Sequence, residues 1–228
     1  MEDVRKGTIM NYEFIREYIP LYIEAAKLTI RIAVIGIIIS VLVGFICSLI
    51  RYYKVPVLHR IIGIYIELSR NTPLLIQLFF LYFGLPRAGI ILSSEACAIT
   101  GLVFLGGSYM SEAFRSGLEA VPESQVESGL SLGLTRFQVV RYVMMPQAIS
   151  VSVPAFAANT IFLIKETSVF SAVALADLMY TAKDLIGLYY ETTEALFMLV
   201  IAYLIILLPV SVLFTVIERK LRHAGFGD

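Results

Sequence analysis

Five apolar stretches in the chain are long enough, or nearly so, to cross the hydrocarbon of a membrane. A membrane-spanning helix needs roughly 20 predominantly apolar residues. Pro154 is expected to kink the fourth stretch, and Pro209 lies inside the fifth. The pattern predicts an all-α integral membrane protein with about five transmembrane helices in a single transmembrane domain over residues 1–228. The five predicted spans cover about residues 28–50, 57–83, 94–110, 146–164 and 195–217.

The composition excludes several other classes of protein. The chain is 58% hydrophobic and 16% charged, whereas charged residues make up about a quarter of an ordinary soluble domain. Its formal net charge of zero argues against nucleic-acid binding. Cys47, Cys97, His59 and His223 show no paired or clustered spacing, so no disulfide framework, metal site or histidine-based catalytic centre is predicted. The chain also lacks the G-x-x-x-x-G-K-[ST] loop that cradles nucleotide phosphates, so any ATP hydrolysis must occur on another chain.

The segments outside the spans give the expected orientation. Residues 1–20 mix charges and aromatics without the pattern of a cleavable signal peptide, and they are expected to form an interfacial helix. Residues 171–184 are amphipathic and are expected to form a surface helix. Five spans place the termini on opposite sides. Basic residues favour the cytoplasmic side, which predicts an external N terminus and an internal C terminus. The basic groups are Arg51, Lys54 and Arg60; Arg115, Arg136 and Arg141; and Arg219, Lys220 and Arg222.

A polar stretch over residues 112–147 interrupts the apolar pattern and predicts two short helices. Ser124 and Glu127 have the spacing of a capping box, as do Thr135 and Gln138. Gly133 between them can take the left-handed conformation that ends a helix. One apolar stripe at helical spacing is predicted from Val126, Leu130, Leu134 and Phe137. A water-facing loop specified in such detail is expected to be a docking surface.

The second predicted span contains an unusual polar run, Glu67 to Gln77. Charges at membrane depth cost roughly 2.5 to 3.5 kcal/mol each, so they normally face protein or a water-filled cavity. Pro73 removes a backbone donor and is expected to loosen residues 69–72, whose freed groups could hold polar ends of a ligand. The alternative is an ion pair between Glu67 and Arg70 that only closes the bundle.

Further polar groups fall on or near the third and fourth spans. Tyr109, Ser111 and Glu112 end the third, where Glu112 either ends its helix or acts as a gate. Asn159 and Glu166 are seven residues apart, so a helix places them on one face. Lys165 is either part of this polar group or an anchor at the membrane boundary. The fourth span closes with Lys165, Glu166, Thr167 and Ser168.

Three motifs resemble the permeases of ATP-binding-cassette (ABC) importers. The polar stretch resembles their "EAA" loop, with Glu127-Ser128-Gly129 in place of Glu-Ala-Ala and with Gly133 and Pro146 in register. The run Arg70-Asn-Thr-Pro-Leu-Leu-Ile-Gln77 resembles the R-G-T-P-L-L-x-Q segment of the polar amino-acid branch, with Asn71 for the usual glycine. Residues 165–168 resemble its K-D-T-S signature, with glutamate for aspartate.

This resemblance implies the transmembrane subunit of a type I ABC importer. The loop would be the coupling helix that docks on two cytoplasmic ATPase subunits, through Ser124, Glu127, Ser128, Gly129, Gly133, Leu134, Thr135 and Arg136. ATP and Mg would be bound by those subunits, and this chain would hold no cofactor or metal and catalyse nothing. The other implied partners are a second permease copy or close paralogue, an extracytoplasmic amino-acid-binding protein and the lipid of a prokaryotic inner membrane.

The resemblance further implies alternating-access transport of an amino acid. Its carboxylate would be met by Asn, Thr and backbone amides, and its ammonium by glutamate. The candidate cargo residues are Glu67, Ser69, Arg70, Asn71, Thr72, Tyr109, Asn159, Glu166 and Thr167. Because Glu67, Glu112 and Glu166 outnumber Arg70 and Lys165, a cationic amino acid is expected.

Four alternatives remain open on the sequence. A neutral cargo such as glutamine is compatible with the same class of importer. An ion-coupled secondary transporter would need inverted repeats and an ion site, which the pattern does not offer. An intramembrane enzyme would need a nucleophile–base or metal constellation, which the two histidines do not supply. A mere membrane anchor would not need the charged, proline-broken second span.

Overall fold

The computed structural model describes residues 10–225, with side chains described through Lys220, and within this range every regular element is a helix. This confirms the all-α prediction. The four 3₁₀ or π segments are η2 (Phe80–Gly84), η3 (Leu85–Ala88), η4 (Val140–Met144) and η5 (Thr167–Val173). The α-helices are α1 (Tyr12–Tyr52), α2 (Leu58–Arg70), α3 (Leu74–Phe79), α4 (Ser94–Glu119), α5 (Glu123–Ser131), α6 (Arg136–Val139), α7 (Met145–Glu166), α8 (Leu178–Tyr189) and α9 (Thr192–Gly225).

Four of the five predicted spans correspond to helical stretches long and apolar enough to cross a membrane. Within the described residues these stretches are Tyr12–Tyr52, Ser94–Glu119, Arg136–Val173 and Thr192–Lys220. The second predicted span is divided into α2 and α3. Helix α2 has 13 residues and is therefore about 20 Å long, short of the roughly 30 Å hydrocarbon core. Pro73 lies between α2 and α3, so the helix is interrupted where the sequence predicted a loosened backbone.

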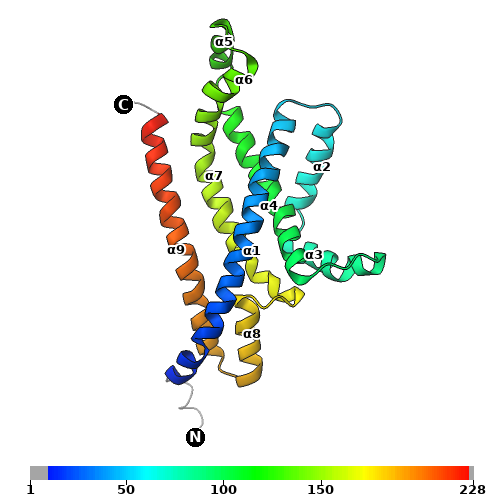
Figure 1. Cartoon of the computed structure of the whole chain (residues 1–228), viewed down its shortest axis with the longest axis vertical. Coiled ribbons are helices and arrows are strands. Elements are labelled where there is room, and N and C mark those ends of the chain that lie inside the picture. The colour runs from blue at the N-terminus through cyan, green and yellow to red at the C-terminus, as the bar shows by residue number, and fades with distance from the viewer. Residues whose placement is uncertain (1–9, 226–228) are drawn as a thin grey trace.

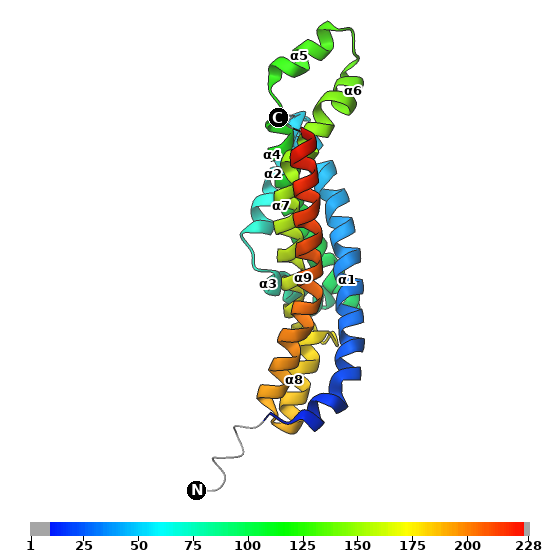
Figure 2. The ribbon, with the colours of Figure 1, turned by 90° about the vertical axis from the view of Figure 1, so that its left-hand side faces the viewer.

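The chain runs back and forth along the long axis of the molecule (Figure 1). Helices α1, α4 and α9 run in one direction, and α2 and α7 run in the other. The described start of α1 therefore lies at the opposite end from the described end of α9, a separation that a view turned by 90° also shows (Figure 2). Helices α5 and α6 project beyond the bundle at the end where α9 finishes. We call this projection, residues 120–144, the end loop.

Three predicted boundaries are wrong. Helix α1 already begins at Tyr12, so residues 12–20 belong to the first long helix and are not a separate interfacial helix; residues 1–9 lie outside the described part. Helix α4 continues to Glu119, so residues 112–119 are helix and not loop. The expected surface helix over residues 171–184 starts later, as α8, because residues 167–173 form a 3₁₀ segment.

Small residues on α1 allow α4 to pack very closely against it. Gly36, Ser40 and Gly44 are four residues apart and lie on one face of α1. A Cβ built on Gly44 would lie 2.5 Å from the Cβ of Met110, and one built on Gly106 would lie 2.4 Å from the hydroxyl of Ser40. Without a hydrophobic force between helices in lipid, such close contact is the main source of helix association.

Candidate functional site

A polar pocket of about 320 Å³ lies where the break between α2 and α3 faces α4 and α7. Arg70, Asn71 and Thr72 contribute one wall, Tyr109 comes from α4, and Glu166 comes from the end of α7. Elements distant in sequence thus bring five of the nine predicted cargo residues to one cavity. The rest of the wall is mostly apolar and was not predicted; it consists of Pro73, Leu74, Leu75, Leu105, Phe162 and Val169.

Arg70 and Glu166 bring opposite charges to this pocket without neutralising each other. The guanidinium of Arg70 lies over the ring of Tyr109, 5.1 Å from its centroid. No ion pair links Arg70 or Glu166 to an opposite charge among the residues with described side chains. The predicted alternative, an ion pair between Glu67 and Arg70, is therefore not formed. A small molecule bearing both charges would find a partner for each in one place.

The break beside the pocket is held by local side chains. The Gln77 amide donates to the backbone oxygens of Ser69 (3.1 Å) and Thr72 (2.9 Å). The Thr72 hydroxyl donates to the oxygen of Leu68 at 2.8 Å, and the Asn71 amide donates to that of Glu67 at 2.8 Å. The donors of Asn71, Thr72 and Gln77 are therefore used within the chain, and the charged side chains of Arg70 and Glu166 remain for a ligand. Gln77 was not among the predicted site residues, although a lone amide in an apolar helix four residues after a proline is a visible signal.

Four predicted cargo residues lie outside the lining of the pocket. Ser69 is buried and its hydroxyl contacts Phe104 O at 2.8 Å and the Ser108 hydroxyl at 2.9 Å. Thr167 is buried, donates to Ile164 O at 2.7 Å and lies 3.3 Å from the hydroxyl of Tyr203. Glu67 is exposed.

Asn159 is next to the pocket rather than in it, because its amide donates to the backbone oxygen of Tyr109 at 3.1 Å. Asn159 thereby fixes the part of α4 that carries the Tyr109 ring. Its predicted neighbour on the same face of α7, Glu166, does line the pocket.

Glu112 belongs to a separate charged cluster nearer the end loop. Its carboxylate pairs with Arg51 of α1 and, at 2.6 Å, with Arg115. Arg115 also pairs with Glu119 at 2.8 Å. The prediction that Glu112 ends its helix is wrong, because α4 continues for seven more residues to Glu119. The cluster ties the end of α1 to α4 at the base of the end loop.

The end loop has the predicted helix–turn–helix form, with one error at its start. Helix α5 begins after Pro122 with no side-chain cap, so the box predicted from Ser124 and Glu127 does not form. Proline fixes its own φ near the helical value and suits a helix start without a capping hydroxyl. The second box is confirmed. The Thr135 hydroxyl accepts from the backbone N–H of Gln138, and the side-chain oxygen of Gln138 accepts from the backbone N–H of Thr135.

The turn between α5 and α6 is the predicted left-handed glycine. Gly133 has φ +83°, a conformation that glycine adopts without strain. Its N–H donates to Leu130 O at 3.0 Å, and the next N–H, of Leu134, donates to Gly129 O at 3.2 Å. This pair of bonds is the Schellman motif, which satisfies the last carbonyls of α5 and sets the angle at which α6 leaves.

The end loop presents apolar and acidic side chains away from the bundle. Gly129 is buried, and a Cβ there would lie 3.1 Å from Val139, so its small size serves the loop's own packing rather than the approach of another protein. Glu127 is exposed, and Leu132 and Phe137 are 83% and 73% exposed. The predicted apolar stripe is therefore split, because Leu130 and Phe137 are exposed while Val126 and Leu134 pack inward. Exposed apolar groups of this kind at a water-facing tip are typical of a docking surface.

Comparison with known proteins identifies the family. Residues 36–223 match the family described as binding-protein-dependent transport system inner membrane component. The chain belongs to this family. It is 34% identical over 220 residues to the probable amino-acid permease protein YxeN of Bacillus subtilis, which covers 93% of this chain and 96% of the relative. It is 30% identical over 206 residues to the glutamine transport system permease protein GlnP of Escherichia coli K12, which covers 90% of this chain and 94% of that protein.

Solved structures give the same result for the fold. A chain in the crystal structure of an amino acid ABC transporter with histidines superposes with a TM-score of 0.86 at 29% identity, over 93% of this chain and all of that one. A chain of the inward-facing MetNI methionine ABC transporter superposes with a TM-score of 0.74 at 19% identity, over 90% of this chain and 98% of that chain, which supports the fold alone.

Family membership confirms the resemblance drawn from the motifs. The chain is a multi-pass inner-membrane permease subunit with the type I importer fold. In ABC importers the ATPase activity resides on separate subunits, and a binding protein supplies the cargo.

Proposed function

We propose that the chain carries a polar amino acid through the cytoplasmic membrane as the permease of an ATP-driven importer. The observation that carries this proposal is the polar pocket, in which Arg70 and Glu166 lie on one cavity without pairing with each other. An amino acid carries a carboxylate and an ammonium on one carbon. Arg70 binds the carboxylate, and Glu166 binds the ammonium. Charge-assisted contacts of both signs compensate the loss of water from a zwitterion.

The charge of the cargo side chain is a separate part of the proposal. The expectation of a cationic amino acid counted three carboxylates, but only Glu166 lines the pocket; Glu112 is paired with two arginines and Glu67 lies outside the lining. The relatives bear names that include glutamine, and one solved transporter was crystallised with histidines. We therefore propose a polar amino acid and leave cationic and neutral cargo to be separated by experiment. Glu166→Gln lowers cationic more than neutral uptake if a cationic side chain is preferred, and it leaves their ratio unchanged if it is not.

The end loop is proposed as the site where the ATPase subunits dock. Exposed Glu127 and Ser128 on α5 make the polar contacts, and the exposed Leu132 supplies apolar area. The rigid glycine turn at Gly133 and the cap at Thr135 transmit displacement of α5 into α6 and α7. Two ATPase subunits with their ATP and Mg, and two permease copies or this chain and a paralogue, complete the importer. ATP-driven closure of the ATPases makes the pocket alternate between the two sides.

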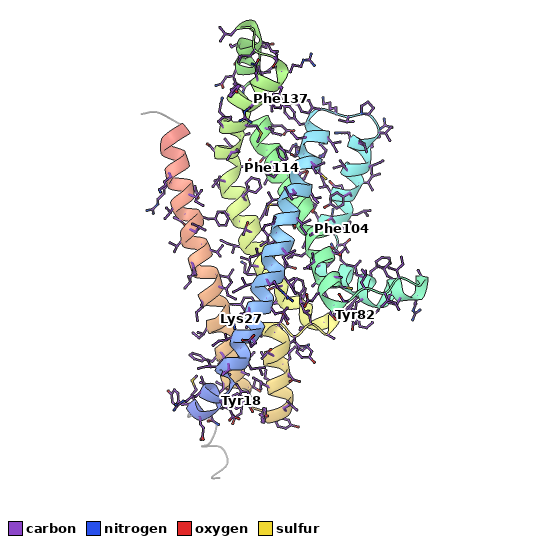
Figure 3. The ribbon with its side chains drawn as sticks, in the orientation of Figure 1. Tyr18, Lys27, Tyr82, Phe104, Phe114 and Phe137 are labelled. Carbon is purple, nitrogen blue, oxygen red and sulfur yellow. The ribbon has the colours of Figure 1, made fainter. Side chains whose placement is uncertain are left out.

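The orientation in the membrane follows from the proposed docking. The end loop, the end of α9 and the connection after α1 lie at one end of the molecule (Figure 1). Basic residues from all three segments accumulate there, which is the cytoplasmic pattern. Tyr18 and Lys27 lie toward the opposite end (Figure 3). The C terminus is then inside and the N terminus outside, where the binding protein delivers the amino acid.

Uptake by the reconstituted importer tests the proposal. Proteoliposomes containing this chain, its ATPases and its binding protein are supplied with ATP and a panel of radiolabelled amino acids. Arg70→Gln and Glu166→Gln should each lower uptake about 10- to 100-fold, the loss expected for one hydrogen bond to a charged group. Asp184→Asn is the control, because Asp184 is an exposed acid on α8 that does not line the pocket.

Three results would contradict the proposal. Full uptake by both pocket variants would remove the pocket from the transport route. Equal losses with the Asp184→Asn control would show a general effect of charge. Uptake that needs an ion gradient and persists without ATP would instead favour a secondary transporter.

A further inference from the structure

A second and larger pocket lies beside the base of the end loop. Its volume is about 820 Å³. One wall is α1, where Phe45, Leu49 and Tyr53 recur every four residues and therefore share a face. The facing wall is built by residues of η4 and α7, again four apart: Arg141, Met145 and Ile149. We call this cavity the arginine-rimmed pocket. Two helical ridges with mostly apolar side chains thus flank an open channel that runs along the direction of the predicted spans.

Two arginines line this otherwise apolar cavity and have no acidic partner. Arg136 and Arg141 both line the pocket. Among the residues whose side chains are described, neither forms an ion pair, and Arg141 only approaches the ring of Tyr142, at 5.8 Å. Glu112 and Glu119, the acids at the end of α4, are already paired with Arg51 and Arg115. The cavity therefore carries two uncompensated positive charges.

The pocket lies where a membrane surface is expected. Phe137, another lining residue, lies near the end of the bundle that carries α5 and α6 (Figure 3). Tyr53, Tyr142 and Phe137 are 55%, 64% and 73% exposed. Aromatic side chains gather at the level of lipid headgroups, and basic pockets between spans on the cytoplasmic side bind anionic headgroups. The apolar walls continue from this level toward the membrane interior through Leu49, Phe45 and Ile149.

We propose that the arginine-rimmed pocket binds one anionic phospholipid of the cytoplasmic leaflet. The guanidinium groups of Arg136 and Arg141 hold the phosphate, and an acyl chain lies between the α1 ridge and the α7 ridge. Charge complementarity selects this occupant, because a neutral lipid or an apolar helix would leave both arginines without a counter-charge. The bound lipid would join α1 to the base of the end loop, the part that moves with the ATPases. The inference rests on the membrane placement and not on the identity of the cargo.

Lipid binding to the purified full-length chain tests this inference. Dioleoylphosphatidylglycerol and dioleoylphosphatidylcholine are titrated onto the detergent-solubilised chain, and bound lipid is counted by native mass spectrometry. The wild-type chain should retain one phosphatidylglycerol in preference to phosphatidylcholine. At roughly five-fold per basic side chain near an anionic headgroup, Arg136→Gln with Arg141→Gln should weaken phosphatidylglycerol binding about thirty-fold and leave phosphatidylcholine unchanged.

A matched control separates the pocket from general charge. Lys54→Gln with Arg60→Gln removes two exposed basic residues from the same end of the molecule that do not line the pocket, and it should retain binding. A second variant, Ile149→Trp, keeps both arginines and fills the channel, so it should also lose the lipid.

Three outcomes overturn the inference. One is equal retention of the two lipids by the wild-type chain. Another is an arginine variant, folded by circular dichroism, that binds phosphatidylglycerol like the control. The third is complete displacement of the lipid by saturating ATPase subunits, which would assign the pocket to the ATPase interface. None of these measurements depends on transport, so their failure is distinct from failure of the proposed function.

Discussion

The contact between α1 and α4 gives the sharpest prediction about stability, because a single methyl group tests it. A Cβ on Gly44 would lie 2.5 Å from Met110 Cβ, 2.7 Å from Ser111 N and 2.8 Å from Met110 C. Two of these three atoms are backbone, so no side-chain rotation relieves the collision. Gly44→Ala must therefore move the two helices apart at this contact. Overpacking of this kind costs about 1 to 3 kcal/mol.

Gly63 provides the matched control on α2. A Cβ there would have no heavy atom within 4 Å. Gly63→Ala gains only the better helix propensity of alanine, about 1 kcal/mol. Gly44→Ala gains the same helix propensity inside α1, so the two variants should differ by the overpacking cost alone, about 1 to 3 kcal/mol in the free energy of unfolding. Unfolding by sodium dodecyl sulfate, followed by far-ultraviolet circular dichroism, measures this difference. If Gly44→Ala proves as stable as Gly63→Ala, the close approach of α1 and α4 is refuted.

Three further predictions concern the charged cluster, the end loop and α8. Arg51→Gln should destabilise the fold by about 2 kcal/mol, less than for a fully buried pair because both side chains of the Arg51–Glu112 pair are 21% exposed. Glu112→Gln should cost less in this background than in the wild type, and additive losses in a double-mutant cycle would exclude the pair. Thr135→Ala should remove about 1 kcal/mol of cap energy, so that hydrogen exchange of residues 136–139 speeds up about five-fold while α9 is unchanged; equal exchange would exclude the cap. Burial raises the pKa of Asp177 to about 6, against a partial opposing effect of the Tyr180 N–H. The folded state then holds the proton more tightly than the unfolded state. The contribution of Asp177 to the free energy of unfolding is therefore greatest below about pH 4, and it falls by about 3 kcal/mol as the pH rises through about 6. Asp177→Asn should abolish that part of the pH dependence of the free energy of unfolding. An unchanged pH dependence in this variant would contradict the role given to Asp177.

Features written in local sequence were predictable. Gly133 needed a left-handed turn, Thr135 and Gln138 had reciprocal capping spacing, and Pro73 broke a helix, and each behaves as expected. Length and hydropathy predicted four of the five spans correctly, since lipid requires long apolar helices whatever the tertiary contacts. The gathering of Arg70 and Glu166 into one pocket was anticipated because both are too costly to leave in lipid.

Features decided by packing partners were not predictable. Pro122 starts α5 in place of the expected Ser124 cap, because two valid helix starts two residues apart compete and sequence alone does not rank them. Ser69 and Thr167 looked like ligand groups, but the fold gives Ser69 the distant oxygen of Phe104 and brings Tyr203 next to Thr167. Glu112 looked like a helix end, yet it lies within α4 and pairs with Arg51, which is distant in sequence.

The small-residue face of α1 was visible and was missed. Gly36, Ser40 and Gly44 repeat every four residues, which in a membrane helix indicates a close helix partner. Gln77, four residues after Pro73, is a second such signal. The small-residue repeat and Gln77 lie in segments that were interpreted only from hydropathy or charge. A search for small residues and single amide side chains within the predicted spans would have found both signals.

The central claim is that the end loop is the surface by which separate ATPase subunits move this permease. Co-purification of the ATPases with Glu127→Arg tests it most directly, since Glu127 is exposed on α5. Asp184→Arg, an equal charge reversal at an exposed site on α8 near the opposite end, is the control. The account predicts that Glu127→Arg releases the ATPases while Asp184→Arg retains them. Full retention by Glu127→Arg, or equal release by both variants, would contradict it.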